Sequence, residues 1–322
     1  MAMYRRIQAK DADTGEVLGN LLMKNDGSEE LILDARNIKT PKQIAFFNSK
    51  NEFKHHCKIT LGGYVNMIYA NNEILFNELN IDKSNISRVI YLATYIDYND
   101  RQEGLLVNQI RDAEGKYSTL EPMTKKDIQK VLGLTDSTFK RFLKDMKDNS
   151  IIFEADKKFY INPSYFTKGE VDKEIKKNKS FCRLFINTIR DLYEGCKTSQ
   201  HKVLSSIYQL IPFIHYEHNI VCHNPKEPTQ EPKGMTLNEI CDLLGINNDK
   251  GNRSNFAKKL YQFKLNLKGQ EYHLFSYVIV NADYDYFVVN PLVIYSGNNL
   301  ESIMRTSRAM FFNSRTHRQK RK

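Results

Sequence analysis

The chain has 322 residues, 41% of them hydrophobic and 27% charged, and contains no Trp. This length allows two domains with sizeable cores, while no apolar run approaches the ~20 residues that a membrane-spanning helix needs. The 48 Lys and Arg outnumber the 38 Asp and Glu, and the resulting charge of +10 favours a polyanionic partner such as nucleic acid.

The N-terminal stretch MAMYRRIQAKDADTGE lacks the apolar segment and small-residue cleavage site of a secretory signal, so we expect a cytoplasmic protein. In that compartment cysteines stay reduced, and an odd number at uneven spacing does not suggest a disulfide framework. The five are Cys57, Cys182, Cys196, Cys222 and Cys241.

Residues 1–83 contain short β-rich runs around glycine turns. The runs are IQAKDADTGEVLGNLLMKN, EELILDAR and FKHHCKITLGGYVNMIY. We expect a small β-rich N-terminal extension that caps the domain following it.

Two twelve-residue phrases match, MTKKDIQKVLGL from Met123 and MTLNEICDLLGI from Met235. Each has a Thr followed three residues later by an acid, which predicts a capping box at a helix start. Apolar residues at i, i+3 and i+4 then form one face of a short helix, and a glycine ends it. The residues concerned are Thr124, Asp127, Ile128, Val131, Leu132 and Gly133, and then Thr236, Glu239, Ile240, Leu243, Leu244 and Gly245.

A second helix follows each glycine, over 136–148 and 253–264, the second after the inserted residues NNDKGN. Each presents one apolar stripe and an opposite face rich in cations, hydroxyls and amides, as in a helix-turn-helix. The stripes consist of Phe139, Phe142, Leu143 and Met146, and of Phe256, Leu260 and Phe263.

The similarity extends to the flanks. SRVIYLATYIDY (87–98) aligns with SSIYQLIPFIHY (205–216), and each apolar helix precedes a short strand, GLLVN or NIVCHN. After each helix-turn-helix comes a hairpin that ends in Asn-Pro, at Asn162 and at Asn290. We therefore predict an α+β, mainly helical chain with tandem winged helix-turn-helix domains, at 84–170 and 198–300.

Residues 171–197 carry an apolar stripe that predicts a helix, either a connector between the domains or part of the first one. The stripe consists of Phe181, Leu184, Phe185, Thr188, Ile189 and Leu192. Residues 301–322 end in the cationic run NSRTHRQKRK, and we expect a basic, disordered tail that adds phosphate affinity or solubility.

Catalytic motifs are absent from the sequence: there is no P-loop, no C-x-x-C and no H-E-x-x-H. The cluster HYEHNIVCH contains His215, His218, Cys222 and His223, which are all possible zinc ligands. However, it aligns with ordinary helix-end and strand residues of the first domain. We therefore predict no enzymatic activity, no cofactor and no metal.

Residues 60–170 resemble the winged-helix plasmid and phage replication proteins of Gram-positive bacteria, the RepL-like group. The most specific segments are the first helix-turn-helix, its hairpin and the closing I-N-P-x-x-F-x-K-G. The doubled plan is also similar to that of iteron-plasmid initiators. The resemblance implies a protein that binds origin repeats and recruits host replication proteins.

The leading hypothesis is sequence-specific binding of double-stranded DNA, with the second helix of each domain in a major groove. Residues near the helix starts would read bases, whereas the other cations would meet phosphates. Candidate contacts are Ser137, Thr138, Lys140, Arg141, Lys144, Lys157, Lys158, Arg253, Ser254, Asn255, Lys258 and Lys259. Two alternatives stay open, a transcriptional regulator and a winged-helix module that binds host proteins, and a homodimer is one possible oligomeric state.

Overall fold

The computed structural model of the protein describes residues 4–10, 17–24, 31–32, 41–69, 81–98, 104–111, 117–169, 171–178, 180–227, 230–247, 249–267, 269–279, 285–297 and 299–319. Two units are distinguished, Met1–His55 and His56–Lys322. The chain is an α+β protein, 46% helical with small antiparallel sheets, which confirms the predicted class.

Unit 1 contains an antiparallel sheet of order β1-β2-β3, from β1 (Tyr4–Lys10), β2 (Val17–Lys24) and β3 (Leu31–Ile32). The expected strands of the N-terminal extension are present there. The helix α1 (Pro41–Thr60) corrects the rest of that prediction, because FKHHCKIT is helical and only the following run forms a strand. Glycines at 62 and 63, both at positive φ, separate the helix from this strand.

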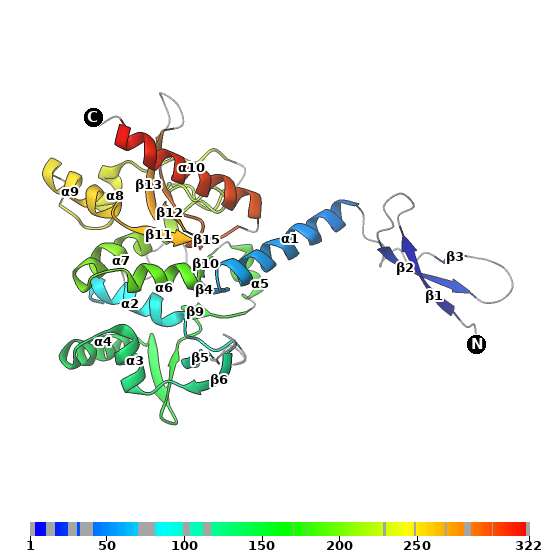
Figure 1. The fold of residues 1–322 in the computed structure, drawn as a ribbon, viewed down its shortest axis with the longest axis horizontal. Coiled ribbons are helices and arrows are strands. Elements are labelled where there is room, and N and C mark those ends of the chain that lie inside the picture. The colour runs from blue at the N-terminus through cyan, green and yellow to red at the C-terminus, as the bar shows by residue number, and fades with distance from the viewer. Residues whose placement is uncertain are drawn as a thin grey trace. The chain divides into compact units, whose positions relative to one another are not determined.

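Unit 2 contains the end of α1, from His56, and the remaining described elements (Figure 1). Its helices are α2 (Lys83–Ala93), α3 (Lys125–Leu132), α4 (Asp136–Asp148), α5 (Lys173–Lys177), α6 (Ile186–Glu194), α7 (His201–Gln209), α8 (Leu237–Leu243), α9 (Lys250–Leu260) and α10 (Leu300–Gln319). Its strands are β4 (Tyr64–Ile68), β5 (Val107–Arg111), β6 (Tyr117–Pro122), β7 (Ile152–Ala155), β8 (Lys158–Ile161), β9 (Phe166–Thr167), β10 (Phe181–Phe185), β11 (Lys264–Leu267), β12 (Gln270–His273), β13 (Phe275–Ile279), β14 (Asp285–Val289) and β15 (Ile294–Tyr295).

The two duplicated segments of the sequence each contribute strands to one shared sheet, of order β15-β10-β4-β9. Residues 64–167, from β4 to β9, form what we call the first repeat, and residues 181–295, from β10 to β15, form the second. The central strands pair antiparallel with Asn66 opposite Arg183, and the outer pairs match: Asn66 faces Thr167 while Arg183 faces Tyr295. The two repeats are therefore related by an approximate twofold axis at the centre of this sheet.

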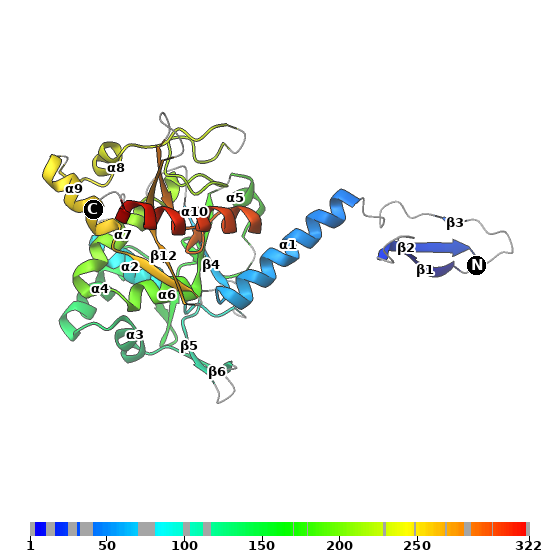
Figure 2. The ribbon, with the colours of Figure 1, turned by 45° about the horizontal axis from the view of Figure 1, so that its top comes forward.

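Helices α2 and α7 meet on the same axis. The backbone N–H of Ser87 donates to Oγ of Ser205, its counterpart in the sequence alignment, over 2.9 Å. Tyr193 of α6 stacks on Tyr91 of α2 with ring centroids 4.1 Å apart. In both Figure 1 and Figure 2, α2, α6 and α7 lie between the helix pairs α3–α4 and α8–α9.

The repeated Asn-Pro has a structural role in both repeats. The side-chain amide of Asn162 donates to the carbonyl of Ser150, and that of Asn290 donates to the carbonyl of His273. The amide oxygens accept from the backbone two residues later, at Ser164 and Leu292. Each Asn thus joins the start of its hairpin to the turn that leads into the shared sheet.

Residues 171–197 do not form one helix, and this prediction was wrong. The segment contains α5, strand β10 and helix α6. All residues of β10 are buried because the strand is central in the shared sheet, so its apolar run mimics a helical stripe. The six predicted stripe residues are nevertheless all buried.

The predicted disordered tail is also corrected, because α10 extends through residue 319. Ile303 and Met310 of this helix are fully buried. Their spacing of seven residues places them on one helix face. The helix packs on β12 and β13, and Met310 forms a buried cluster with Tyr286 and Val288 of β14. Among the described residues, no helix is both long and apolar enough to cross a membrane.

Candidate nucleic-acid interface

The first helix of each pair begins at a capping box, as the sequence predicts. Thr124 accepts from the backbone N–H of Asp127, and the Asp127 carboxylate accepts from that of Thr124 over 2.8 Å. Thr236 and Glu239 repeat the arrangement. These hydrogen bonds from threonine lower the pKa of both carboxyl groups, so they stay charged at the positive ends of their helices.

Both turns use a left-handed glycine. Gly133 has φ 61° and Gly245 has φ 63°, values that cost other residues conformational energy. The carbonyls just before them are held by the opposite repeat. Tyr193 Oη donates to the carbonyl of Leu132 over 3.0 Å, and Lys83 Nζ donates to that of Leu244 over 2.6 Å. The two helix pairs are therefore anchored to one frame.

Helix α4 covers the predicted range 136–148, and its whole predicted apolar stripe is buried. The predicted contact residues lie outside this stripe. Thr138 is half-buried and hydrogen-bonded to Thr135 over 3.0 Å. The others are exposed: Ser137, Lys140, Arg141 and Lys144.

Acidic residues on α4 have separate roles. Asp145 accepts from the backbone N–H of Asp82 and, over 2.6 Å, from the amide of Asn85, and so ties α4 to the start of α2. Asp136 accepts from Gln129 of α3, whereas Asp148 is exposed. Asp145 is thus a structural residue, while Asp136 and Asp148 reduce the positive charge of this helix.

The hairpin β7–β8 follows α4 and turns at Asp156–Lys157, both at positive φ, as a two-residue turn between right-twisted strands favours. The predicted contacts Lys157 and Lys158 are exposed there. At the base, Lys147 pairs with Glu154 over 2.7 Å, and this bond lowers the pKa of Glu154.

Helix α9 differs from its predicted bounds, because it starts at Lys250 inside the insertion and ends at Leu260. Asp249 caps it by accepting from the backbone N–H of Asn252 over 2.8 Å. The insertion therefore lengthens the helix at its start. Phe263 leaves the helix but remains buried, ahead of an unpredicted hairpin, β11–β12.

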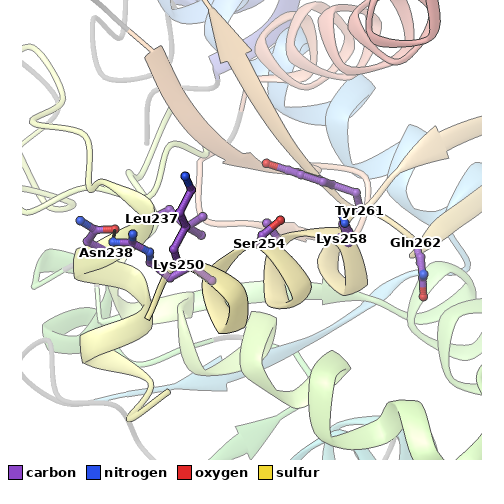
Figure 3. Close-up of a pocket in the computed structure, with 9 residues that line it drawn as sticks. Leu237, Asn238, Lys250, Ser254, Lys258, Tyr261 and Gln262 are labelled. Carbon is purple, nitrogen blue, oxygen red and sulfur yellow. Dashed lines mark hydrogen bonds between the residues drawn. The ribbon is translucent and has the colours of Figure 1, made fainter. Parts of the chain in front are cut away.

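A hollow of about 790 Å³ lies along α9 (Figure 3). It is lined by Leu237 and Asn238 of α8 together with Lys250, Arg253, Ser254, Ala257, Lys258, Tyr261 and Gln262. Three predicted contacts are brought together here: Arg253, Ser254 and Lys258. The predicted Asn255 and Lys259 are exposed but do not line the hollow.

Sequence reasoning missed the remaining polar lining residues, above all Lys250, Asn238 and Tyr261. A start of α9 at the Asp249 cap would have found two of them, since positions 250, 254, 258 and 261 follow one helix face. Arg253 also donates to the side-chain oxygen of Asn238, which links the two helices.

The hollow offers ammonium, guanidinium, hydroxyl and amide groups within one concave surface. Burial raises the pKa of Tyr261 to about 12, so its hydroxyl stays neutral and can donate a hydrogen bond. These groups suit phosphate oxygens and base edges. Among the described residues no cluster of His, Cys, Asp and Glu could hold a metal ion, and the five cysteines are free.

Comparisons with protein-family models, with curated proteins and with solved structures give no match to this chain.

Proposed function

We propose that the protein binds double-stranded DNA sequence-specifically through two winged helices. The order of elements in each repeat supports this: a helix, a short bridging segment, a helix pair and a hairpin, with β5–β6 added before the first helix pair and β11–β12 added after the second. Leu105 bridges to Tyr160 of the hairpin, and Ile220 bridges to Val288. In winged helices the short segment that follows the first helix typically pairs in this way with the second strand of the hairpin, here β8 and β14. The carrying observation is the cationic hollow along α9, which is the second helix of its pair.

The shared frame suits the reading of two successive sites. Tyr193 and Lys83 hold both turns across the centre, and α4 and α9 lie on the same side of unit 2 in both views (Figures 1 and 2). We expect the helices to enter major grooves about one turn, ~10 bp, apart or a multiple of it. The wing residues Lys157 and Lys158 would contact the backbone.

The preferred role is initiation of plasmid or phage replication, because the first repeat resembles RepL-like proteins. Binding of origin repeats and recruitment of host replication proteins require no chemistry of this chain. The same DNA-binding surface would serve a transcriptional regulator, so the two roles need separate tests.

Selection of bound sequences from random duplexes at several salt concentrations tests DNA binding. We expect a motif of two half-sites and a steep loss of affinity with salt. Absence of an enriched motif, with binding unchanged by Lys140→Ala combined with Lys258→Ala, would reject the proposal.

A plasmid whose only origin is this gene with its flanking DNA tests the role. For an initiator, the same double variant abolishes plasmid maintenance even when a constitutive promoter drives expression. Maintenance without the protein, with altered transcript levels alone, would identify a regulator.

A further inference from the structure

The hairpins β7–β8 and β13–β14 have equivalent backbone hydrogen bonds, so the residues on their outer faces can be matched one by one. In the first repeat Leu106 N–H donates to the Phe159 carbonyl, and in the second Val221 N–H donates to the Phe287 carbonyl. Tyr160 therefore corresponds to Val288, and Lys158 to Tyr286. Because Phe153 pairs with Tyr160 and Ser276 with Val288, Phe153 corresponds to Ser276.

In the second repeat this outer face is covered by a helix. Tyr286 and Val288 are 8% and 5% exposed and form a buried cluster with Met310 of α10, against which Ile220 also packs. α10 lies across β13 in Figure 1. The sheet surface is thus shaped to accept an amphipathic helix.

In the first repeat no helix among the described residues covers the matching face. Phe153 is 41% exposed, although it is a large apolar side chain, and Tyr160 is half-buried. Their rings stack 5.1 Å apart at 7°, which forms a flat aromatic surface. The helix that follows β9, as α10 follows β15, is α5, which has five residues and none buried.

We infer that this aromatic face, formed by Phe153, Tyr160 and Lys158, binds an amphipathic helix of a partner protein. A helix is the occupant that the equivalent sheet accepts in this chain, and exposed stacked aromatics are typical anchors for one. Charge defines the partner further. α10 carries exposed Arg305 and Arg308, whereas the first repeat has exposed Lys158 where the second has Tyr286. The partner helix therefore carries acidic residues beside its apolar stripe.

The inference does not depend on DNA binding, because Phe153 and Tyr160 lie on the hairpin and are not among the proposed DNA contacts. Lys158 is the one residue of the aromatic face that the wing would also offer to the DNA backbone. A partner could dock there while α4 and α9 bind their ligand. It would give the first repeat a recruiting function that the second, covered by α10, lacks.

A single-tryptophan reporter tests the inference, since the chain has no Trp. Phe153→Trp places the fluorophore on the aromatic face, and Tyr98→Trp, at a site 71% exposed in the same repeat, is the control. The probes are two stapled helical peptides with the sequence of Leu300–Gln319. One is unchanged, and the other carries Arg305→Glu and Arg308→Glu.

We expect both peptides to shift the Phe153→Trp emission to shorter wavelength, with the acidic peptide binding roughly fivefold or more tightly. The control reporter stays unchanged. With labelled peptide, Phe153→Ser combined with Tyr160→Thr abolishes binding, whereas Tyr98→Ser does not.

Three results would overturn the inference. The first is no emission shift with either peptide. The second is a shift with protein concentration alone, together with a doubled mass in solution, which would assign the face to a second copy of the chain. The third is a shift with duplex DNA but not with peptide, which would make it a nucleic-acid contact.

Discussion

Helices α4 and α9 occupy equivalent places in the two repeats but present different surfaces. α4 carries Lys140, Arg141 and Lys144 together with Asp136 and exposed Asp148, whereas no acidic residue occurs within α9, Lys250–Leu260. Their supporting helices, in contrast, share the capping box and the left-handed glycine. Folding requires the cap, the glycine and the buried stripe. It leaves the exposed face free to diverge, so we expect unequal contributions to DNA binding.

The largest effect is expected from the buried core of the first pair. Phe142 is 0% exposed, and Phe142→Ala should cost about 3–5 kcal/mol of unfolding free energy. Because the repeats share the sheet through β4 and β10, urea unfolding should show one transition, shifted as a whole. The exposed Lys140→Ala should change stability by under about 0.5 kcal/mol. Two transitions, only one of them shifted, would show that the repeats unfold independently.

A pH dependence is expected where the repeats meet. His201 is 4% exposed, and burial, with a further contribution from Arg88, lowers its pKa to about 4. The unfolded chain binds the proton near pH 6.5, whereas the folded chain resists it. The free energy of unfolding therefore has its full value above pH 6.5, where His201 is neutral in both states. It falls by up to about 3 kcal/mol toward pH 4.

Urea midpoints between pH 7 and pH 4 measure this loss. His201→Gln should flatten the dependence, and the exposed His223→Gln should preserve it. Equal curves for wild type and His201→Gln would assign the acid sensitivity to other groups.

Substitutions on the exposed faces of α9 and α4 should reduce DNA affinity by different factors. Lys258→Ala with Lys259→Ala should weaken duplex binding roughly 30-fold at 0.15 M salt. The slope of log affinity against log salt concentration should become less steep by about two. Lys140→Ala with Lys144→Ala should cost less, about fivefold, because Asp136 and Asp148 already repel phosphate. Lys173→Ala with Lys176→Ala on α5, which Figures 1 and 2 place opposite α4 and α9, is the control. Equal losses in the two helix variants would contradict the predicted asymmetry.

The smallest effect should be equal in both repeats. Thr124→Ala and Thr236→Ala each remove a cap and should each cost about 1 kcal/mol. Thr135→Ala is a matched control, because Thr135 stands at the N-cap of α4 without a capping hydrogen bond, and its cost should be smaller. Thermal unfolding measures all three. A large cost for only one capping threonine would show that the repeats do not share their local design.

Much of the local structure followed from the sequence. The capping boxes, the glycine turns, helix α4 and the hairpins β7–β8 and β13–β14 were predicted, and the stripe from Phe139 to Met146 is buried as expected. Errors occurred where an apolar run is compatible with two structures, as in β10. The hollow along α9 was only partly predicted. The helix starts after a cap at Asp249, which lies within an insertion that the sequence pattern assigned to the turn.

The sequence by itself determined the repeated local elements, because caps, glycines and helical spacing act between residues close in the chain. Only the tertiary structure decided that β4 and β10 pair across an approximate twofold axis, and that Tyr193 and Lys83 anchor each other's helix pairs. It also decided that α10 covers one hairpin face while Phe153 remains exposed on the other. These features join residues about 20 to 160 positions apart, and such contacts depend on how buried surfaces match in space, which no local pattern specifies.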